Sequence, residues 1–298
     1  MMMERNGEYE DGHIEIKGIN LYYKRFGKGN RHKILALHGG PGGTHDYLLP
    51  LADLADRDYD IVFYDQFGCG NSDNPKSEGD YTLDYAIEEV EAVRSRFFVN
   101  EKINLFGNSW GGMLALAYAI KYQEHLLTVI SSSGLSSVPE TVKEMKRLIS
   151  LMPEKYKNAI NDGEKLGDYG SAAYKEADEY FMKNHTLRIY PYPPEVMHLM
   201  EMTEKRGTYL KMNGPSEFTI IGTIKDIDFT EDLHKIRVPT LITCGLYDEV
   251  TPKIAEDIHS RIKKSEMLVF RNSSHLQFWE ERSEYMDAID RFIKRHDF

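Results

Sequence analysis

Short apolar runs alternate with longer stretches of helical periodicity, and this alternation strongly limits the folds open to the chain. Each run is compact and ends near glycine, serine or charged residues, which suits strands buried on both faces of a parallel sheet. The runs are Ile34–Leu37, Ile61–Tyr64, Ile103–Phe106, Leu127–Ile130, Thr240–Thr243 and Met267–Phe270. Between runs, Leu83–Phe98 and Met113–Tyr122 repeat apolar residues at helical spacing. The alternation predicts a doubly wound, mostly parallel α/β sheet.

Residues 136–225 break this pattern. They read as helices rich in tyrosine and methionine, interrupted by Pro153 and by the Tyr190–Pro194 breaker. A chain of 298 residues has room for one α/β domain with an insertion. We therefore predict a core in two parts, residues 1–135 and 226–298, with a helical cap at residues 136–225. Ile14–Phe26 predicts an opening β-hairpin, and an amphipathic helix is expected from Arg282 to Arg295.

Composition excludes several classes of function. The 37 Lys and Arg against 48 Asp and Glu give a net charge of -11, and no basic run occurs, so nucleic acid and anionic membranes are not expected as partners. The two cysteines, Cys69 and Cys244, form no CxxC pattern or Cys/His cluster, so we expect no disulfide framework, no metal site and no cofactor. The sequence shows no apolar leader and no membrane-length apolar stretch, which predicts a cytoplasmic location.

The sharpest motif is Gly107-Asn108-Ser109-Trp110-Gly111, which lies between a predicted strand and a predicted helix. This is the strand-turn-helix setting of a nucleophile elbow, in which small residues permit a sharp turn that presents a serine hydroxyl. A Gly-x-Ser-x-Gly pattern also arises by chance, and a purely structural glycine turn is the alternative. The placement favours Ser109 as a catalytic nucleophile in an α/β-hydrolase fold.

A serine nucleophile needs a histidine to accept its proton and a carboxylate to orient that histidine. In this fold the chain order is serine, acid, histidine. Asp248 and His275 have that order, and each follows a predicted strand, where sites in open α/β sheets form. A turn-forming aspartate and a surface histidine are the alternatives, but order and placement together favour the triad Ser109, Asp248 and His275.

The glycine-rich stretch His38–Gly43 follows another predicted strand. Its bare backbone suits an oxyanion hole, and we expect the N–H groups of Gly40 and Trp110 to be the donors. A phosphate-binding loop is the competing interpretation. No Gly-Lys-Ser/Thr follows, and Pro41 removes a donor, so the oxyanion hole is favoured.

Five stretches together resemble the prolyl iminopeptidases, serine peptidases of the α/β-hydrolase fold. The resemblance covers the core and part of the cap, and HGGPG with DQ-x-G-x-G-x-S is far more specific than the elbow alone. The matching stretches are His38–Gly43, Asp65–Ser72, Gly107–Gly112, Met212–Phe218 and Gly245–Pro252.

The resemblance implies an aminopeptidase whose two carboxylates, Glu217 and Glu249, hold the free α-amino group of the substrate. It is strongest to the archaeal branch associated with tricorn protease, which implies short peptide substrates and a tricorn-like protease complex as a partner. Bacterial members typically carry arginine where Phe67 stands, and often where Asn71 stands. This departure implies that other small or apolar N-terminal residues are accepted besides proline.

Two rival functions remain open. An esterase or other acyl hydrolase would use the same fold and triad, because these alone do not select the substrate. A noncatalytic binding module would keep the fold without the chemistry. Turnover that depends on a free substrate amine would exclude the first, and labelling of Ser109 by a fluorophosphonate would exclude the second.

Overall fold

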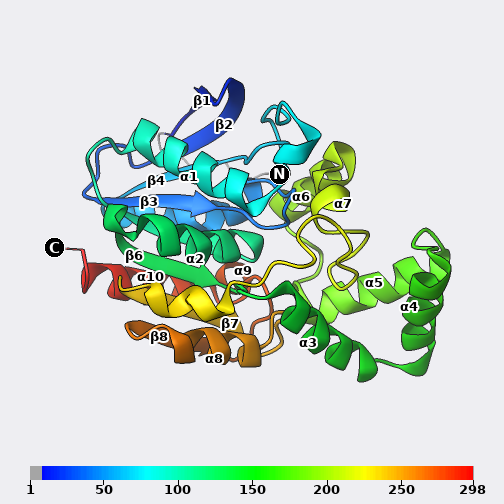
Figure 1. The fold of residues 1–298 in the computed structure, drawn as a ribbon. Helices are drawn as coiled ribbons and strands as arrows, with labels where there is room; N and C mark the ends of the chain where they lie inside the picture. Colours follow the sequence, from blue (N-terminus) through cyan, green and yellow to red (C-terminus); the bar gives the residue numbers. More distant parts are fainter. Residues whose placement is uncertain (1–8, 298) are drawn as a thin grey trace.

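A twisted eight-stranded sheet forms the centre of the molecule (Figure 1). The computed structural model describes residues 9–297. The strand order is β1-β2-β4-β3-β5-β6-β7-β8, in which β1 and β2 are antiparallel to their neighbours and the remaining pairs are parallel. The strands are β1 Tyr9–Ile16, β2 Ile19–Phe26, β3 His32–Leu37, β4 Tyr59–Tyr64, β5 Ile103–Asn108, β6 Leu126–Ser132, β7 Thr240–Gly245 and β8 Ser265–Phe270.

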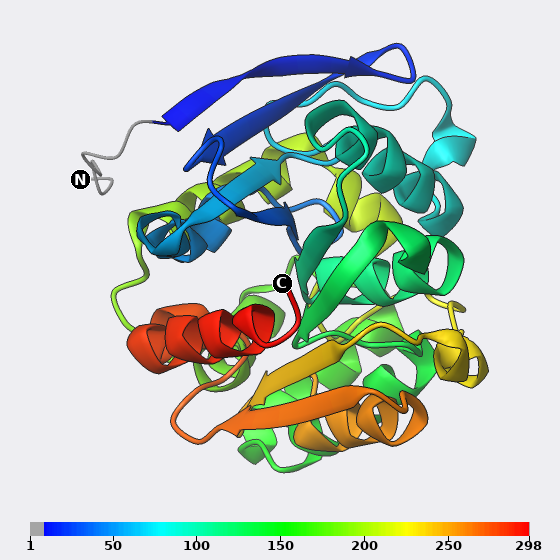
Figure 2. The ribbon, with the colours of Figure 1, turned by 90° about the vertical axis from the view of Figure 1, so that its left-hand side faces the viewer.

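Helices cover both faces of the sheet, as Figure 2 shows in a view along its edge. One apolar cluster packs α1 (Leu83–Phe97), α2 (Trp110–Tyr122) and α8 (Pro252–Arg261) on one face. A second packs the 3₁₀ helix η1 (Asp46–Arg57) and α10 (Arg282–Lys294) on the other. The central strands β3 to β7 are almost wholly buried, because they are covered on both sides.

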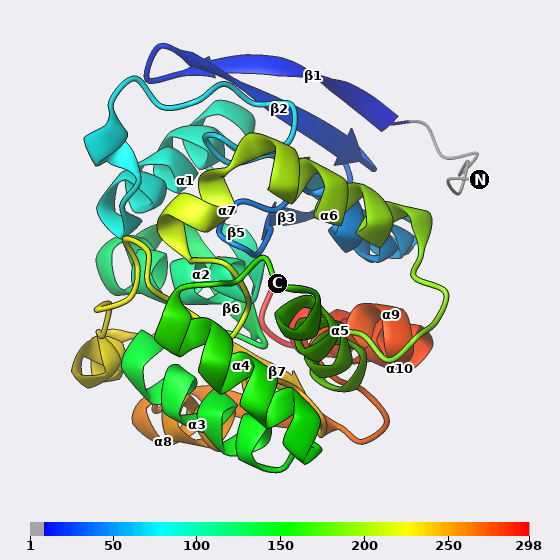
Figure 3. The same cartoon turned by 90° about the vertical axis from the view of Figure 1, so that its right-hand side faces the viewer.

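The insertion between β6 and β7 carries five helices beyond the carboxyl ends of the parallel strands (Figure 3). Its two connections to the core lie side by side, because Ser137 pairs with Asp228 in a β-bridge and donates a side-chain hydrogen bond to it at 2.8 Å. A separate apolar cluster holds α3, α4 and α5 together. The five helices are α3 Val138–Ser150, α4 Glu154–Leu166, α5 Ala172–His185, α6 Pro194–Arg206 and α7 Thr208–Met212.

The remaining short elements are α9 (Gln277–Glu280) and the 3₁₀ helices η2 (Glu78–Asp80), η3 (Gln123–His125) and η4 (Thr230–Lys235). The predicted fold class is confirmed, and every predicted strand and the closing helix are present. The domain boundaries at residues 135/136 and 225/226 stay predictions. Within residues 9–297, no helix is both long and apolar enough to cross a membrane.

Candidate active site

Ser109 lies at the tip of the turn between β5 and α2. Its backbone has φ 60° and ψ -123°, the strained conformation of a nucleophile elbow, and the residue lines the cavity beside it. The turn closes only with glycine on both sides. A Cβ on Gly107 would lie 1.9 Å from the Gly111 carbonyl oxygen, and one on Gly111 would lie 2.1 Å from the Leu37 carbonyl oxygen.

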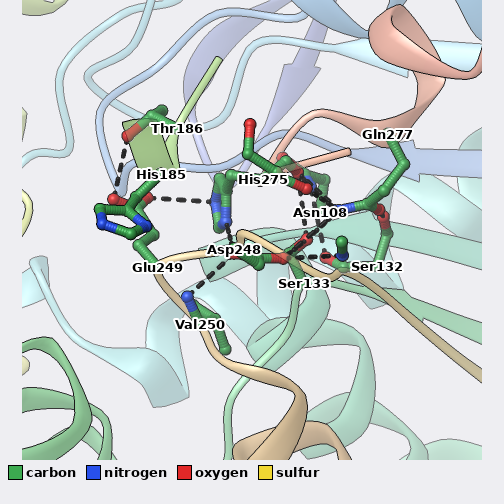
Figure 4. Close-up of polar contacts among 12 residues, drawn as sticks. Asn108, Ser132, Ser133, His185, Thr186, Asp248, Glu249, Val250, His275 and Gln277 are labelled. Atoms are coloured by element: carbon green, nitrogen blue, oxygen red, sulfur yellow. Dashed lines mark hydrogen bonds and ion pairs between the residues drawn. The ribbon is translucent and has the colours of Figure 1, made fainter. Parts of the chain in front are cut away.

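Asp248 and His275 meet above the carboxyl ends of β7 and β8 (Figure 4). The His275 Nδ1 lies 2.7 Å from the Asp248 Oδ1, and both side chains are buried. Asp248 is fixed by a 2.6 Å hydrogen bond from the Ser133 hydroxyl and a 2.9 Å bond from the Val250 N–H. Gln277 adds a 3.3 Å amide hydrogen bond to the same carboxylate. The imidazole is therefore oriented through a rigid carboxylate.

The third pair of the predicted triad is not hydrogen-bonded. Ser109 and His275 line the same cavity, but among residues 9–297 no hydrogen bond joins the serine hydroxyl to the imidazole. The His275 Nε2 instead lies 3.6 Å from the Glu249 Oε1. The structure thus brings Asp248 and His275 into contact and places Ser109 at the same cavity as His275, while the Nε2 of His275 is paired with Glu249.

Two spaces that share several lining residues lie beside Ser109. The larger cavity has a volume of about 450 Å³ and is walled by α5, α6 and α7. The smaller one has a volume of about 30 Å³. Its walls are mostly apolar and come from both the core and the cap: Met113, Leu135, Met145, Ile220, Ile224 and Val250.

Glu217 and Glu249 line both spaces. Glu249 is 1% exposed, and its Oε2 accepts a 3.0 Å hydrogen bond from the Thr186 hydroxyl. Burial raises the pKa of both carboxyl groups, that of Glu249 well above its usual range. Among the described residues that line the two spaces, none is a lysine or arginine. A cation bound in this space would stabilise the ionised form of both carboxyl groups.

These carboxylates also act on the imidazole. Burial by itself lowers the pKa of His275, but the nearby carboxylates of Asp248, Glu249 and Glu217 outweigh it and raise the pKa to about 9. At neutral pH the imidazole and its carboxylate neighbours consequently hold one proton more than a neutral imidazole with ionised carboxylates would.

Gly40 and Trp110 lie next to Ser109 at the smaller space. The Trp110 N–H belongs to the first residue of α2, where an N–H has no acceptor within the helix. The Gly40 N–H donates to no acceptor within residues 9–297. Gln66 fixes the two segments to each other, since its side chain donates to the His38 carbonyl oxygen at 2.8 Å and accepts from the Trp110 indole N–H at 2.9 Å.

Several polar residues of the site were not predicted from the sequence. Ser133 and Gln277 hold Asp248, and Thr186 holds Glu249. Asp178 of α5 lines the larger cavity with its Oδ1 buried and without a partner in the described chain. The run of serines at the end of β6 could have indicated Ser133, whereas the positions of Thr186 and Asp178 depend on how the cap packs.

Comparison with known proteins places this geometry in a family. The family model of the α/β-hydrolase fold matches residues 34–282. A proline iminopeptidase of Saccharolobus solfataricus is 54% identical over 285 residues, which covers 95% of this chain and 92% of the relative. One from Thermoplasma volcanium is 51% identical, covering 99% and 100%.

A solved structure agrees with these relatives. The crystal structure of proline iminopeptidase from Mycobacterium smegmatis superposes with a TM-score of 0.89 at 26% identity, covering 97% of this chain and 99% of that one. Identity and coverage of this order extend over core and cap alike. The chain therefore belongs to the proline iminopeptidase family of α/β hydrolases.

Proposed function

We propose that this chain is a serine aminopeptidase that releases N-terminal proline, or another small or apolar residue, from short peptides. The observation that carries the proposal is the pair of buried carboxylates, Glu217 and Glu249, that share a cavity with Ser109 and face no lysine or arginine there. A substrate ammonium supplies the missing positive charge. Family membership points to the same reaction.

The chemistry proceeds through an acyl-enzyme. Ser109 attacks the first peptide carbonyl while His275 takes the hydroxyl proton, and Asp248 stabilises the imidazolium that forms. The N–H groups of Gly40 and Trp110 stabilise the oxyanion. His275 then gives the proton to the leaving amine, and a water molecule, activated by the same imidazole, releases the free amino acid.

The two spaces bind different parts of the substrate. Glu217 and Glu249 line both spaces, and in this proposal the N-terminal residue enters the smaller one, of about 30 Å³, with its amine against these two carboxylates. A space of this size with apolar walls favours proline and small residues. The larger cavity, about 450 Å³, receives the peptide that leaves. Because the amine is bound one residue from the scissile bond, an internal peptide bond cannot be cleaved.

The test is a panel of aminoacyl anilides with a free or an acetylated N-terminus. We expect turnover of prolyl and alanyl anilides and none after acetylation, because acetylation removes the charge. Glu217→Gln and Glu249→Gln should each lose ~2–5 kcal/mol in kcat/KM, roughly 30- to 5000-fold. Glu256→Gln, an exposed change on α8, is the control.

Other outcomes of this panel would identify the rival functions. Equal turnover of free and acetylated substrates, or activity confined to uncharged esters, would indicate an esterase. Absence of fluorophosphonate labelling at Ser109 would indicate a binding module. A tricorn-like protease complex as the source of the peptides, and a cytoplasmic location, stay predictions.

A further inference from the structure

Glu249, which we assign to amine binding, also contacts the imidazole of His275. The Glu249 Oε1 lies 3.6 Å from His275 Nε2, the nitrogen that must accept the Ser109 proton, and both side chains are at most 5% exposed. The other His275 nitrogen, Nδ1, is held by Asp248 at 2.7 Å. The imidazole is thus engaged at both nitrogens by two consecutive residues.

We propose that Glu249 holds the general base inactive in the free enzyme, and that the substrate's ammonium releases it by taking over the carboxylate. The proposal rests on the proposed function and extends it. Recognition of the N-terminus and activation of the nucleophile then become one event, so a molecule without an amine fails at the chemical step even when it fits the cavity.

Each proton of this step can be followed. In the free enzyme one proton lies between Glu249 and Nε2 of His275, whichever of the two formally carries it. The arriving ammonium pairs with Glu249, and that shared proton leaves to solvent. The Nε2 lone pair is then free, and it takes the proton of the Ser109 hydroxyl as the Ser109 oxygen attacks.

Few other charged groups face this imidazole. Asp248 and Glu249 come from the loop after β7, and Glu217 comes from the segment after α7. From α5, His185 contributes its backbone oxygen, which accepts the His275 N–H at 3.2 Å, while its own Nδ1 lies 2.8 Å from the Tyr247 carbonyl oxygen. Of these groups, Glu249 is the one in contact with Nε2.

A fluorophosphonate isolates the effect, because it labels Ser109 through the same base and carries no amine. In the wild type the labelling rate should rise with pH towards a midpoint near 9. In Glu249→Gln the midpoint should fall by at least about one pH unit, with labelling at pH 7 about tenfold faster. The same variant should be slower on prolyl anilide. Opposite changes on the two reagents distinguish release of the base from structural damage, which would slow both.

The outcomes separate the two proposals. Unchanged or slower labelling by Glu249→Gln at pH 7, with turnover of anilides intact in the wild type, would overturn this inference alone. Faster labelling without any anilide turnover would overturn the proposed function alone. If the variant fails to fold, the wild type alone can test the inference. On the acid side, the pH midpoint of kcat for prolyl anilide should lie well below the pH midpoint of labelling. Coincident midpoints would refute the inference. Glu256→Gln is again the control.

Discussion

Glu89 is a buried acid that tests the electrostatic reasoning without involving the reaction. It lies on α1, is 1% exposed, and accepts the Phe67 N–H at 3.3 Å through one oxygen. Its second oxygen is buried with no partner among the described residues. Burial raises the pKa of Glu89 from 4.5 to about 8, so the folded protein holds this side chain neutral at pH 7.

The sign of the pH effect follows from the proton count. Between pH 4.5 and about 8 the folded state keeps a proton on Glu89 that the unfolded chain has released. Stability therefore falls as pH rises, by up to ~1.4 kcal/mol per pH unit, with an upper limit of about 5 kcal/mol over the window. Water drawn in beside the ionised carboxylate reduces this, so we expect about 2–4 kcal/mol.

Replacement of Glu89 by glutamine removes the titration and keeps an oxygen for the Phe67 N–H. The difference in unfolding free energy between Glu89→Gln and the wild type should rise from pH 5 to pH 8 and then level off, as measured by urea denaturation at each pH. The neighbouring Glu88 is the control: Lys121 and Tyr122 lower its pKa below 4.5, so both states are ionised above pH 5, and the difference between Glu88→Gln and the wild type should stay constant from pH 5 to pH 8. Parallel stability curves for Glu89→Gln and the wild type would refute the assignment.

Two further predictions concern the cap. Gly42 has φ +114°, and a Cβ there would lie 2.5 Å from the Tyr209 backbone nitrogen, so Gly42→Ala should displace α7 and lower the unfolding free energy by about 2–3 kcal/mol. Gly29→Ala, at φ +91° in open space, should cost only about 1 kcal/mol in the same denaturation assay. Met145→Ala enlarges the smaller space and should raise the ratio of leucyl to prolyl anilide kcat/KM about tenfold. Met152→Ala, buried in the same apolar cluster but away from that space, should leave the ratio unchanged.

The core could be predicted from the sequence because its strands are apolar runs that are too short for a helix and are bounded by turn residues. The predictions were less accurate for the start of the first strand and for the segment between β3 and β4. The strand β1 begins at Tyr9, before the predicted hairpin, because an edge strand with alternating polar residues completes its pairing with Phe26. The 3₁₀ helix η1 was not predicted, since Pro50 interrupts its helical pattern, yet it packs six buried residues against the sheet.

Some residues of the site could be predicted from the sequence and others could not. Ser109, Asp248 and His275 follow strands, so the topology of the sheet alone directs them to one edge. Glu217 comes from the insertion, and only the family resemblance indicated it. The contact between Glu249 and the Nε2 of His275 had no sequence signal, because it depends on how the buried Glu249 side chain packs.

The adjacency of Asp248 and Glu249 links substrate specificity to the state of the catalytic base. Both carboxylates come from one turn after β7, yet they meet opposite nitrogens of the same imidazole, Asp248 at Nδ1 and Glu249 at Nε2. A hydrolase with this triad and a neutral residue at position 249 would have a free base and no need of an amine. We therefore expect Glu249→Gln to move the chain towards amine-independent ester hydrolysis, whereas Asp248→Asn should lower turnover of both substrate classes.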